Sequence, residues 1–267
     1  MQKTILITGS TDGIGLATAK QLISQGHQIL LHGRNATKLR AVVEQLNAQY
    51  PNANIQSYVS DLSNMQDVKA LAKAVTDQHS SLDVLINNAG VFRTPNLITS
   101  DGMDVRFAVN TFAPYLLTQL LLPLMSNTSR VINLSSAAQA PVDIDALRGK
   151  ARLDDMGAYA QSKLAITMWS RVEGLAHAAN GPMIVAVNPG SLLGSKMVKE
   201  GFGVEGGDLQ IGADILCKAA LHEDFSAASG QYFDNDAKQF APPHPDALDD
   251  SKAEAITKAV GEILARA

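Results

Sequence analysis

The stretch KTILITGSTDGIG, residues 3–15, decides the fold of this chain. Its first half is apolar or β-branched, which predicts a strand buried on both faces. Glycines follow at Gly9, Gly13 and Gly15, and a helix is predicted from about Gly13 to Gln25. Glycines between a buried strand and a helix let a pyrophosphate approach the free N–H groups at the helix N-terminus. The spacing is G-x-x-x-G-x-G and so differs from the general dinucleotide fingerprint G-x-G-x-x-G, but the glycines can serve the same purpose.

The rest of the chain alternates strands and helices. Further strands are predicted near residues 28–32, 55–59, 83–87, 130–135, 183–187 and 230–233, and helices near 36–49, 65–79, 101–125, 156–178 and 245–266. Strands joined by helical crossovers form a parallel sheet covered on both faces. We therefore expect one doubly wound, Rossmann-type α/β domain over residues 1–267, with a mostly parallel sheet of seven strands and helices on both faces. Ligands of such sheets bind outside the carboxyl ends of the strands.

The composition narrows the class of function. The chain has 267 residues, 46% of them hydrophobic and 18% charged, and a net charge of −4, which is typical of a globular protein and disfavours nucleic-acid binding. A single cysteine, Cys217, excludes an internal disulfide, and the histidines lack metal-ligand spacing. No apolar run is long enough to span a bilayer, and no signal peptide is recognisable. These features predict a cytoplasmic protein without a membrane span or a metal ion.

The end of the second predicted strand indicates which nicotinamide cofactor is preferred. NAD sites usually place an acid there for the ribose 2′-hydroxyl, whereas NADP sites use an arginine. No Asp or Glu occurs from Gly13 through Val43, and Arg34 follows the strand, with Lys38 close behind. The guanidinium of Arg34 can fork onto a 2′-phosphate, and the alternative is a merely solvated arginine. We expect NADP(H) to be preferred over NAD(H).

Tyr159 and Lys163 are four residues apart, which places them one turn apart on one face of a helix. A phenol beside an ammonium group is expected to have a lowered pKa. Such a phenol can protonate an alkoxide as it forms, or deprotonate an alcohol in the reverse direction. Because the spacing also arises by chance, its meaning depends on the other motifs.

In their order and their placement at strand ends, these motifs resemble the short-chain dehydrogenase/reductases, from the N-terminus to about residue 235. The residues that carry the resemblance are Thr8-Gly9-x-x-x-Gly13-x-Gly15, Asn87-Asn88-Ala89-Gly90, Asn110, Ser135-Ser136, Tyr159-x-x-x-Lys163 and Asn188-Pro189-Gly190. Ser136 and Tyr159 are 23 residues apart, a longer gap than in many members. This gap resembles the retinol-dehydrogenase-like and protochlorophyllide-reductase-like branches.

The resemblance implies a role for each matched residue. Lys163 would hold the nicotinamide ribose, Tyr159 would exchange the proton, and Ser136 would hydrogen-bond the substrate oxygen, with Ser135 as the less favoured serine. Asn110 would kink a helix and hold a water that relays protons to the lysine. Together with Arg34, the residues expected to bind the cofactor are Gly9, Ser10, Thr11, Asp12, Gly13, Ile14, Gly15, Asp61, Leu62, Asn88, Ala89, Gly90, Tyr159, Lys163, Pro189 and Gly190, with Asp61 and Leu62 facing the adenine.

Two segments are expected to border the substrate pocket. The polar stretch 142–155 fills the long gap before Tyr159 as a surface loop whose ends approach the site. The glycine-rich substrate-loop region, 191–209, suits a lid that orders on cofactor binding, and either Ser191 or Ser195 would contact the carboxamide. The C-terminal helical extension, 245–266, would cover the cleft or pack on a second subunit, which leaves a homo-oligomer open.

The predicted function is that of an NADP(H)-dependent alcohol dehydrogenase or carbonyl reductase. It would transfer a hydride between the nicotinamide and an apolar carbonyl or alcohol substrate of small to medium size, with Tyr159 as general acid and base. The alternative is a dinucleotide-binding sensor or scaffold with weak catalysis, which would not need Ser136, Lys163 and Asn110 as well. Sugar-nucleotide epimerases are disfavoured, because the residues after Gly190 are too few for their larger substrate domain.

Overall fold

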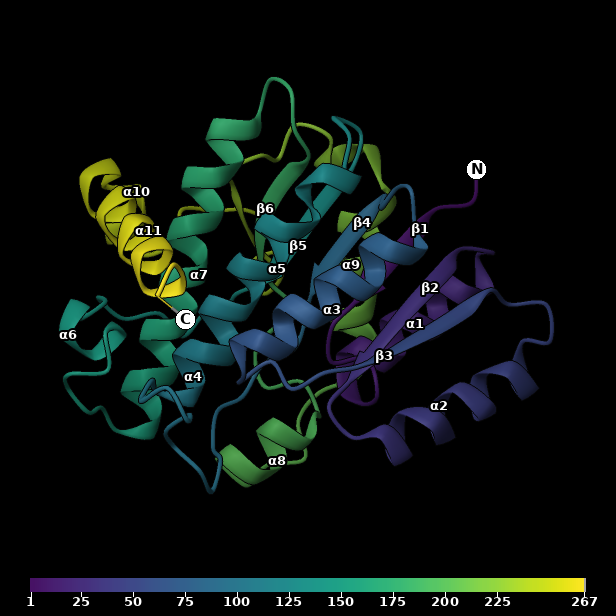
Figure 1. Cartoon of the computed structure of the whole chain (residues 1–267), viewed down its shortest axis with the longest axis horizontal. Coiled ribbons are helices and arrows are strands. Elements are labelled where there is room, and N and C mark those ends of the chain that lie inside the picture. The colour runs from purple at the N-terminus through teal and green to yellow at the C-terminus, as the bar shows by residue number, and fades with distance from the viewer. Residues whose placement is uncertain (267) are drawn as a thin grey trace.

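The computed structural model describes residues 1–266, apart from the side chain of Phe202. Within this part of the chain one eight-stranded sheet has the order β3-β2-β1-β4-β5-β6-β7-β8 (Figure 1). The strands are β1 (Thr4–Ile7), β2 (Gln28–Gly33), β3 (Ile55–Val59), β4 (Val84–Asn87), β5 (Arg130–Leu134), β6 (Met183–Asn188), β7 (Tyr232–Asp234) and β8 (Gln239–Phe240). The first seven pair in parallel, which confirms the predicted doubly wound sheet, and the two-residue β8 adds an antiparallel edge.

Helices cover both faces of this sheet (Figure 1). One face packs against α1 (Gly13–Ser24), α2 (Ala36–Gln49) and α9 (Leu209–Leu221), and the other against α3 (Met65–Gln78), α5 (Ala113–Leu121) and α7 (Asp155–His177). Along β1, Leu6 belongs to one apolar cluster and Ile5 and Ile7 to the other, because successive side chains of a strand point to opposite faces. All three are fully buried, which explains the continuous apolar run of this strand.

The C-terminal helices form a further layer outside α7. The predicted extension is two helices, α10 (Pro245–Leu248) and α11 (Asp250–Leu264), separated at Asp249, whose carboxylate accepts from the N–H of Lys252 and caps α11. α11 packs along α7 (Figure 1), and its Val260 shares an apolar cluster with Leu164 of α7. The helix that carries Tyr159 is therefore covered on both sides.

Some elements differ from the prediction. The helix expected at 101–125 is α4 (Val105–Phe107), a π-helical turn η1 (Ala108–Phe112), α5 and a 3-10 turn η2 (Leu122–Leu124). The helices α6 (Ile144–Leu147), α8 (Lys196–Phe202) and α9, and the 3-10 turn η3 (Glu223–Phe225), lie outside the predicted elements. α6 and α8 are short and begin at side-chain caps, Asp143 and Ser195, a signal too local to stand out in polar or glycine-rich sequence.

One helical stretch, Val105–Leu124, is long and apolar enough to cross a membrane by length and composition. Most of it is buried against the rest of the molecule, where Phe107, Phe112 and Leu117 belong to the core. Because a core helix passes the same test, this stretch is weak evidence for a membrane span.

Candidate active site

The glycine turn brings β1, α1 and the end of β4 into close contact. Gly9 has φ +65°, in the left-handed region that favours glycine. A Cβ on Gly9 would lie 2.8 Å from the Cα of Ala89, and a Cβ on Gly15 would overlap the amide of Asn88. That amide donates a hydrogen bond of 3.0 Å to the carbonyl oxygen of Gly9. The turn therefore tolerates no side chain at either glycine without a shift of its neighbours.

The N-terminus of α1 fits the phosphates of a dinucleotide. Its first N–H groups have no partner within the helix, and its first turn carries no acidic residue. At Gly13, with φ +54°, a Cβ would meet only Ser195, at 3.7 Å, and the N–H of Gly13 donates to Asp12 Oδ1 at 2.8 Å. The N-cap Asp12 forms an ion pair of 2.6 Å with Lys38, and this contact lowers the pKa of its carboxyl. Lys38 thus offsets the negative charge beside the turn.

At the end of the site where the adenosine is expected, the guanidinium of Arg34 is the exposed cationic group. Arg34 is exposed directly after β2. Asp61 is also exposed, but its carboxylate accepts hydrogen bonds from the N–H (2.9 Å) and hydroxyl (2.8 Å) of Ser63. Leu62 is 6% exposed and belongs to an apolar cluster, so its side chain faces the core and not a ligand. Only the backbone of Leu62 is left to border an adenine.

His32, inside the apolar strand β2, ties the glycine turn to the neighbouring strands. Its Nδ1 accepts from the N–H of Gly9 at 3.1 Å, and its Nε2 lies 3.1 Å from the carbonyl oxygen of Ser60. The N–H of His32 donates to the hydroxyl of Ser10 at 2.9 Å. The Ser10 hydroxyl therefore stabilises the glycine turn. Burial lowers the pKa of His32 to about 4. The ring is therefore neutral at pH 7, with the hydrogen on Nε2 as these partners require.

Ser136, Tyr159 and Lys163 lie together beyond the carboxyl end of β5. The hydroxyl of Ser136 lies near the Tyr159 phenol and acts to lower its pKa. The ring of Phe92 meets the Tyr159 ring edge-on, with centroids 5.2 Å apart. The ammonium of Lys163 lies 5.7 Å from the centre of the Tyr159 ring and donates to the carbonyl oxygen of Leu134 at 2.7 Å. Of the two serines after β5, Ser136 is thus the one that meets the phenol.

The pKa of the Tyr159 phenol is raised, not lowered as the sequence led us to expect. Burial raises it, and the neighbouring Ser136 hydroxyl lowers it by less. The ammonium of Lys163 lies over the ring and is directed to the carbonyl oxygen of Leu134. Burial lowers the pKa of Lys163 itself to about 8. A neutral phenol is the form that donates a proton to a carbonyl oxygen.

Asn110 lies in the π-helical turn η1, where a kink was expected. Its Oδ1 accepts from the N–H of Val91 at 2.8 Å, and its Nδ2 donates to the carbonyl oxygen of Val91 (2.9 Å) and to the hydroxyl of Ser162 (3.0 Å). A Cβ on Gly90 would lie 3.5 Å from Asn110 Oδ1 and 3.6 Å from Lys163 Nζ. Asn110, Gly90 and Lys163 therefore border one spot, and the π turn is of the kind often found at functional sites.

A buried ion-pair cluster holds the start of α7. The guanidinium of Arg106, 1% exposed, pairs with Asp104 (Nη2 to Oδ2, 2.6 Å) and with Asp155 (Nη1 to Oδ1, 2.6 Å). Arg93 also approaches Asp155, at 3.6 Å, and its guanidinium lies 5.6 Å from the centre of the Phe92 ring. Because Asp155 begins α7 one turn before Tyr159, the cluster fixes the direction in which the helix presents the phenol.

Residues 190–210, here called the covering segment, close over the site. A Cβ on Gly90 would lie 3.7 Å from Met197 Cε, and a Cβ on Gly201 would lie 2.5 Å from the Phe92 ring. The two serines considered for the carboxamide are placed differently. Ser191 donates its hydroxyl to Asp236 Oδ2 at 2.5 Å, whereas Ser195 accepts from Val198 N–H and begins α8. Ser195 also lies next to Gly13, toward the phosphate end of the site.

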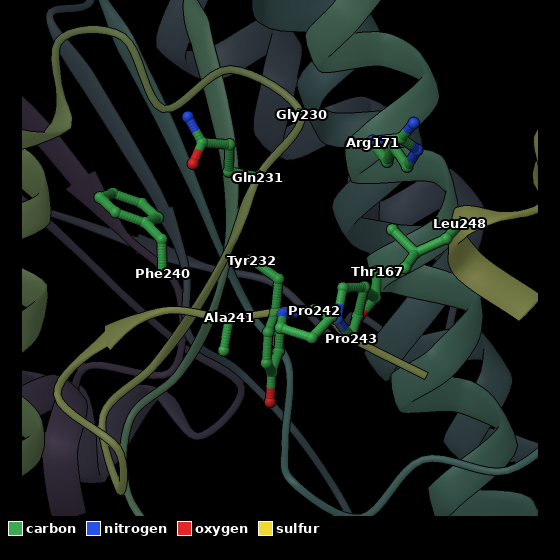
Figure 2. A pocket seen from close by; sticks show the side chains of 10 residues that line it. All are labelled: Thr167, Arg171, Gly230, Gln231, Tyr232, Phe240, Ala241, Pro242, Pro243 and Leu248. Atoms are coloured by element: carbon green, nitrogen blue, oxygen red, sulfur yellow. The ribbon is translucent and has the colours of Figure 1, made fainter. Parts of the chain in front are cut away.

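A cavity of about 270 Å³ lies behind this site, and none of the predicted residues lines it. Thr167 and Arg171 of α7 lie on one side of it, and Gly230 and Gln231 on the other (Figure 2), with Tyr232 also lining it. The hydroxyl of Tyr232 donates to the carbonyl oxygen of Ser136 at 3.1 Å, so Tyr232 separates the cavity from the site.

Several residues of the site lie outside the predicted set. His32 interrupts an apolar strand just before the cofactor-discriminating position, and that interruption is a sequence signal for a buried, partnered group. Asn235 and Asp236 follow β7 at the carboxyl edge of the sheet, and their place just after a predicted strand is a sequence signal for ligand-facing residues. Arg106 has no comparable signal, because nothing local in the sequence brings it to Asp155.

Known proteins resemble the chain in sequence and in fold. The family model described as short chain dehydrogenase matches residues 3–202. Human retinol dehydrogenase 13 is 32% identical over 270 aligned residues, covering 94% of this chain and 81% of that protein. A protein from Mycobacterium paratuberculosis superimposes with a TM-score of 0.80, at 26% identity over 98% of this chain and 93% of that one. A short-chain dehydrogenase from Shigella flexneri, solved as a complex with NADP, gives a TM-score of 0.69 at 26% identity, covering 88% and 97%.

Proposed function

The chain belongs to the short-chain dehydrogenase family, in its retinol-dehydrogenase-like branch, and is an NAD(P)-dependent oxidoreductase of alcohol and carbonyl groups. We propose that it prefers NADP(H) and that Tyr159 is its proton donor and acceptor. The observation that carries the proposal is the grouping of three side chains: the Ser136 hydroxyl lies near the Tyr159 phenol, and the Lys163 ammonium lies 5.7 Å from the centre of the phenol ring. The bound nicotinamide supplies the hydride in reduction and takes it in oxidation.

The side chains divide the remaining work. Ser136 and Tyr159 hydrogen-bond the substrate oxygen, and Tyr159 gives it a proton as negative charge develops there. The raised pKa of Tyr159 keeps the phenol protonated at neutral pH, which suits carbonyl reduction. Lys163 leaves Leu134 to hold the ribose hydroxyls, and its charge then stabilises the tyrosinate. Asn110 orders the loop after β4 against α7 beside the lysine.

The cofactor preference rests on charge. Arg34 is exposed at the end of β2, and Lys38 pairs with Asp12, so the guanidinium of Arg34 is the group that would meet a 2′-phosphate. A solved relative from Shigella flexneri carries NADP, which supports the same choice. The glycine turn, the N-terminus of α1, Asn88 to Gly90 and Pro189-Gly190 would hold the rest of the molecule.

The substrate is proposed to be an apolar alcohol or its carbonyl. Phe92 meets the Tyr159 ring edge-on, and Met197 lies against Gly90, so the walls next to the phenol are apolar. The resemblance to a retinol dehydrogenase points the same way, toward a primary alcohol on a hydrocarbon body. Such a pocket would select by shape and apolar area.

Tyr159→Phe tests the mechanism. The variant should lose at least about 1000-fold in kcat, since it removes the proton donor, while its dissociation constant for NADP⁺ stays within about twofold. Turnover is followed by nicotinamide absorbance over a panel of apolar aldehydes, ketones and alcohols. Substantial activity in the variant would place the proton donor elsewhere. A wild-type protein that binds the cofactor but turns over nothing on a broad panel would favour the sensor or scaffold alternative.

A further inference from the structure

The covering segment is bound to itself more than to the sheet. The N–H of Gly194 donates to the carbonyl oxygen of Gly207 at 2.7 Å. The N–H of Gly207 donates to the carbonyl oxygen of Leu192 at 2.8 Å. Lys199 and Glu205 pair across the same loop at 2.5 Å. A loop closed in this way moves as one body, so its position depends on its two ends.

The first end is held by Asp236, in the turn between β7 and β8. Its Oδ1 accepts from the N–H of Ser191 at 2.9 Å, and its Oδ2 accepts from the hydroxyl of Ser191 (2.5 Å) and from the Nδ2 of Asn188 (2.9 Å). Asn188 also donates to Asp234 Oδ1 at 2.8 Å. Partial burial raises the pKa of Asp236, but the hydrogen bonds from Ser191 and Asn188 outweigh it, so the pKa is lowered and the group is a carboxylate at neutral pH.

The neighbouring side chain reaches both ends of the segment. Asn235 donates from Nδ2 to the carbonyl oxygen of Pro189 (2.9 Å), before the segment, and to that of Ile211 (3.3 Å), just after it. The backbone N–H of Asn235 donates to the carbonyl oxygen of Asn188 at 3.1 Å, which keeps the turn in register with β6. The turn after β7 thus meets the chain where it leaves β6 and where it enters α9.

We propose that the turn after β7 positions the covering segment over the bound cofactor, with Asn235 and Asp236 as positioning residues. The inference rests on the proposed function, because it assumes that NADP(H) lies beneath α8. For the cofactor to leave, the segment must swing away from Gly90 and Phe92, and the hydrogen bonds at both ends oppose that swing. The turn touches no predicted catalytic group, so it acts on cofactor release and not on proton transfer.

Asp236→Ala is the direct test, and Asp77→Ala is its control. Both aspartates accept charge-assisted hydrogen bonds near the surface, but Asp77 pairs with Lys73 on α3, remote from the segment. We expect Asp236→Ala to speed NADP⁺ dissociation and raise the KM for NADPH about tenfold, the usual effect of losing a hydrogen bond to a charged group. kcat should stay within about twofold or rise, since release often limits turnover.

Limited trypsin digestion of the cofactor-free protein tests the same point without turnover. Lys196 and Lys199 of α8 are the sites, and their cleavage should be several-fold faster in Asp236→Ala than in Asp77→Ala, at equal thermal stability. NADP⁺ should restore protection in the wild type. Unchanged dissociation and unchanged cleavage in Asp236→Ala would overturn the proposal, even with a fully active enzyme. If the wild type binds no nicotinamide cofactor, the proposed function fails, and the digestion still decides whether the turn holds the segment.

Discussion

Acid should weaken this fold through His32, and the structure gives the size of the effect. In the folded chain burial lowers the pKa of the ring to about 4, from 6.5 for a solvated histidine. Between these two values the unfolded chain binds the proton and the folded chain does not. The free energy of unfolding therefore rises with pH through this window, and the stabilisation is lost as the pH falls from about 6.5 to about 4. A difference of about 2.5 pKa units at 1.36 kcal/mol each amounts to about 3 kcal/mol.

Two variants separate this titration from the loss of a contact. Asn at position 32 keeps an acceptor near the N–H of Gly9, and Gln keeps a donor near the carbonyl oxygen of Ser60. Each should cost about 1 kcal/mol at pH 7, for one lost hydrogen bond. At about pH 4 each should be more stable than the wild type by about 2 kcal/mol, because neither side chain titrates.

The measurement is urea unfolding at pH values from about 4 to about 7.5. Fluorescence of Trp169, the single tryptophan and fully buried, reports the transition. The curve of unfolding free energy against pH for His32→Asn should cross that of the wild type, and so should the curve for His32→Gln. If the wild type and both variants differ by the same amount at every pH, the ring does not carry the titration, and the reasoning is refuted.

Two further changes test the charges of the site. Arg34→Ala should lower kcat/KM for NADPH by about tenfold or more and leave that for NADH within about twofold, because only the 2′-phosphate loses its partner; equal losses with both cofactors, in steady-state assays, would contradict this. Arg106→Met should lower the free energy of unfolding by about 3–5 kcal/mol, since Asp104 keeps a buried charge without its partner; a loss under about 1 kcal/mol in urea unfolding would show that Asp104 is compensated in another way.

Periodicity carries much of the prediction of this fold. The strands read as short apolar runs because both faces of the sheet are covered, and the glycine turn after β1 marks the cofactor edge. The placement of Ser136, Tyr159 and Lys163 follows from the same topology, since β5 and α7 must meet at the carboxyl edge. The assignment of their roles, and of Arg34 to the 2′-phosphate, stays a prediction.

Other features depend on contacts between distant segments. The raised pKa of Tyr159 follows from burial, which the four-residue spacing does not report. Arg106 meets Asp155 only after α4 and α7 are packed, 49 residues apart along the chain. Asn235 reaches Pro189 and Ile211 because β7 pairs with β6, and the sequence of the turn carries no sign of its partners. Such contacts are decided by tertiary packing and not by local pattern.

The layering of α11 on α7 has a consequence for synthesis. Residues 250–264 leave the ribosome after every strand of the sheet, yet they supply the outer apolar cover of the helix that carries Tyr159. A nascent chain therefore presents the outer side of α7 bare while the sheet and the glycine turn are already complete in sequence. A stop codon at residue 249 would leave the proton-transfer residues in place and expose an apolar face of α7. Such a truncated product should be lost to aggregation or proteolysis before it is lost to faulty chemistry.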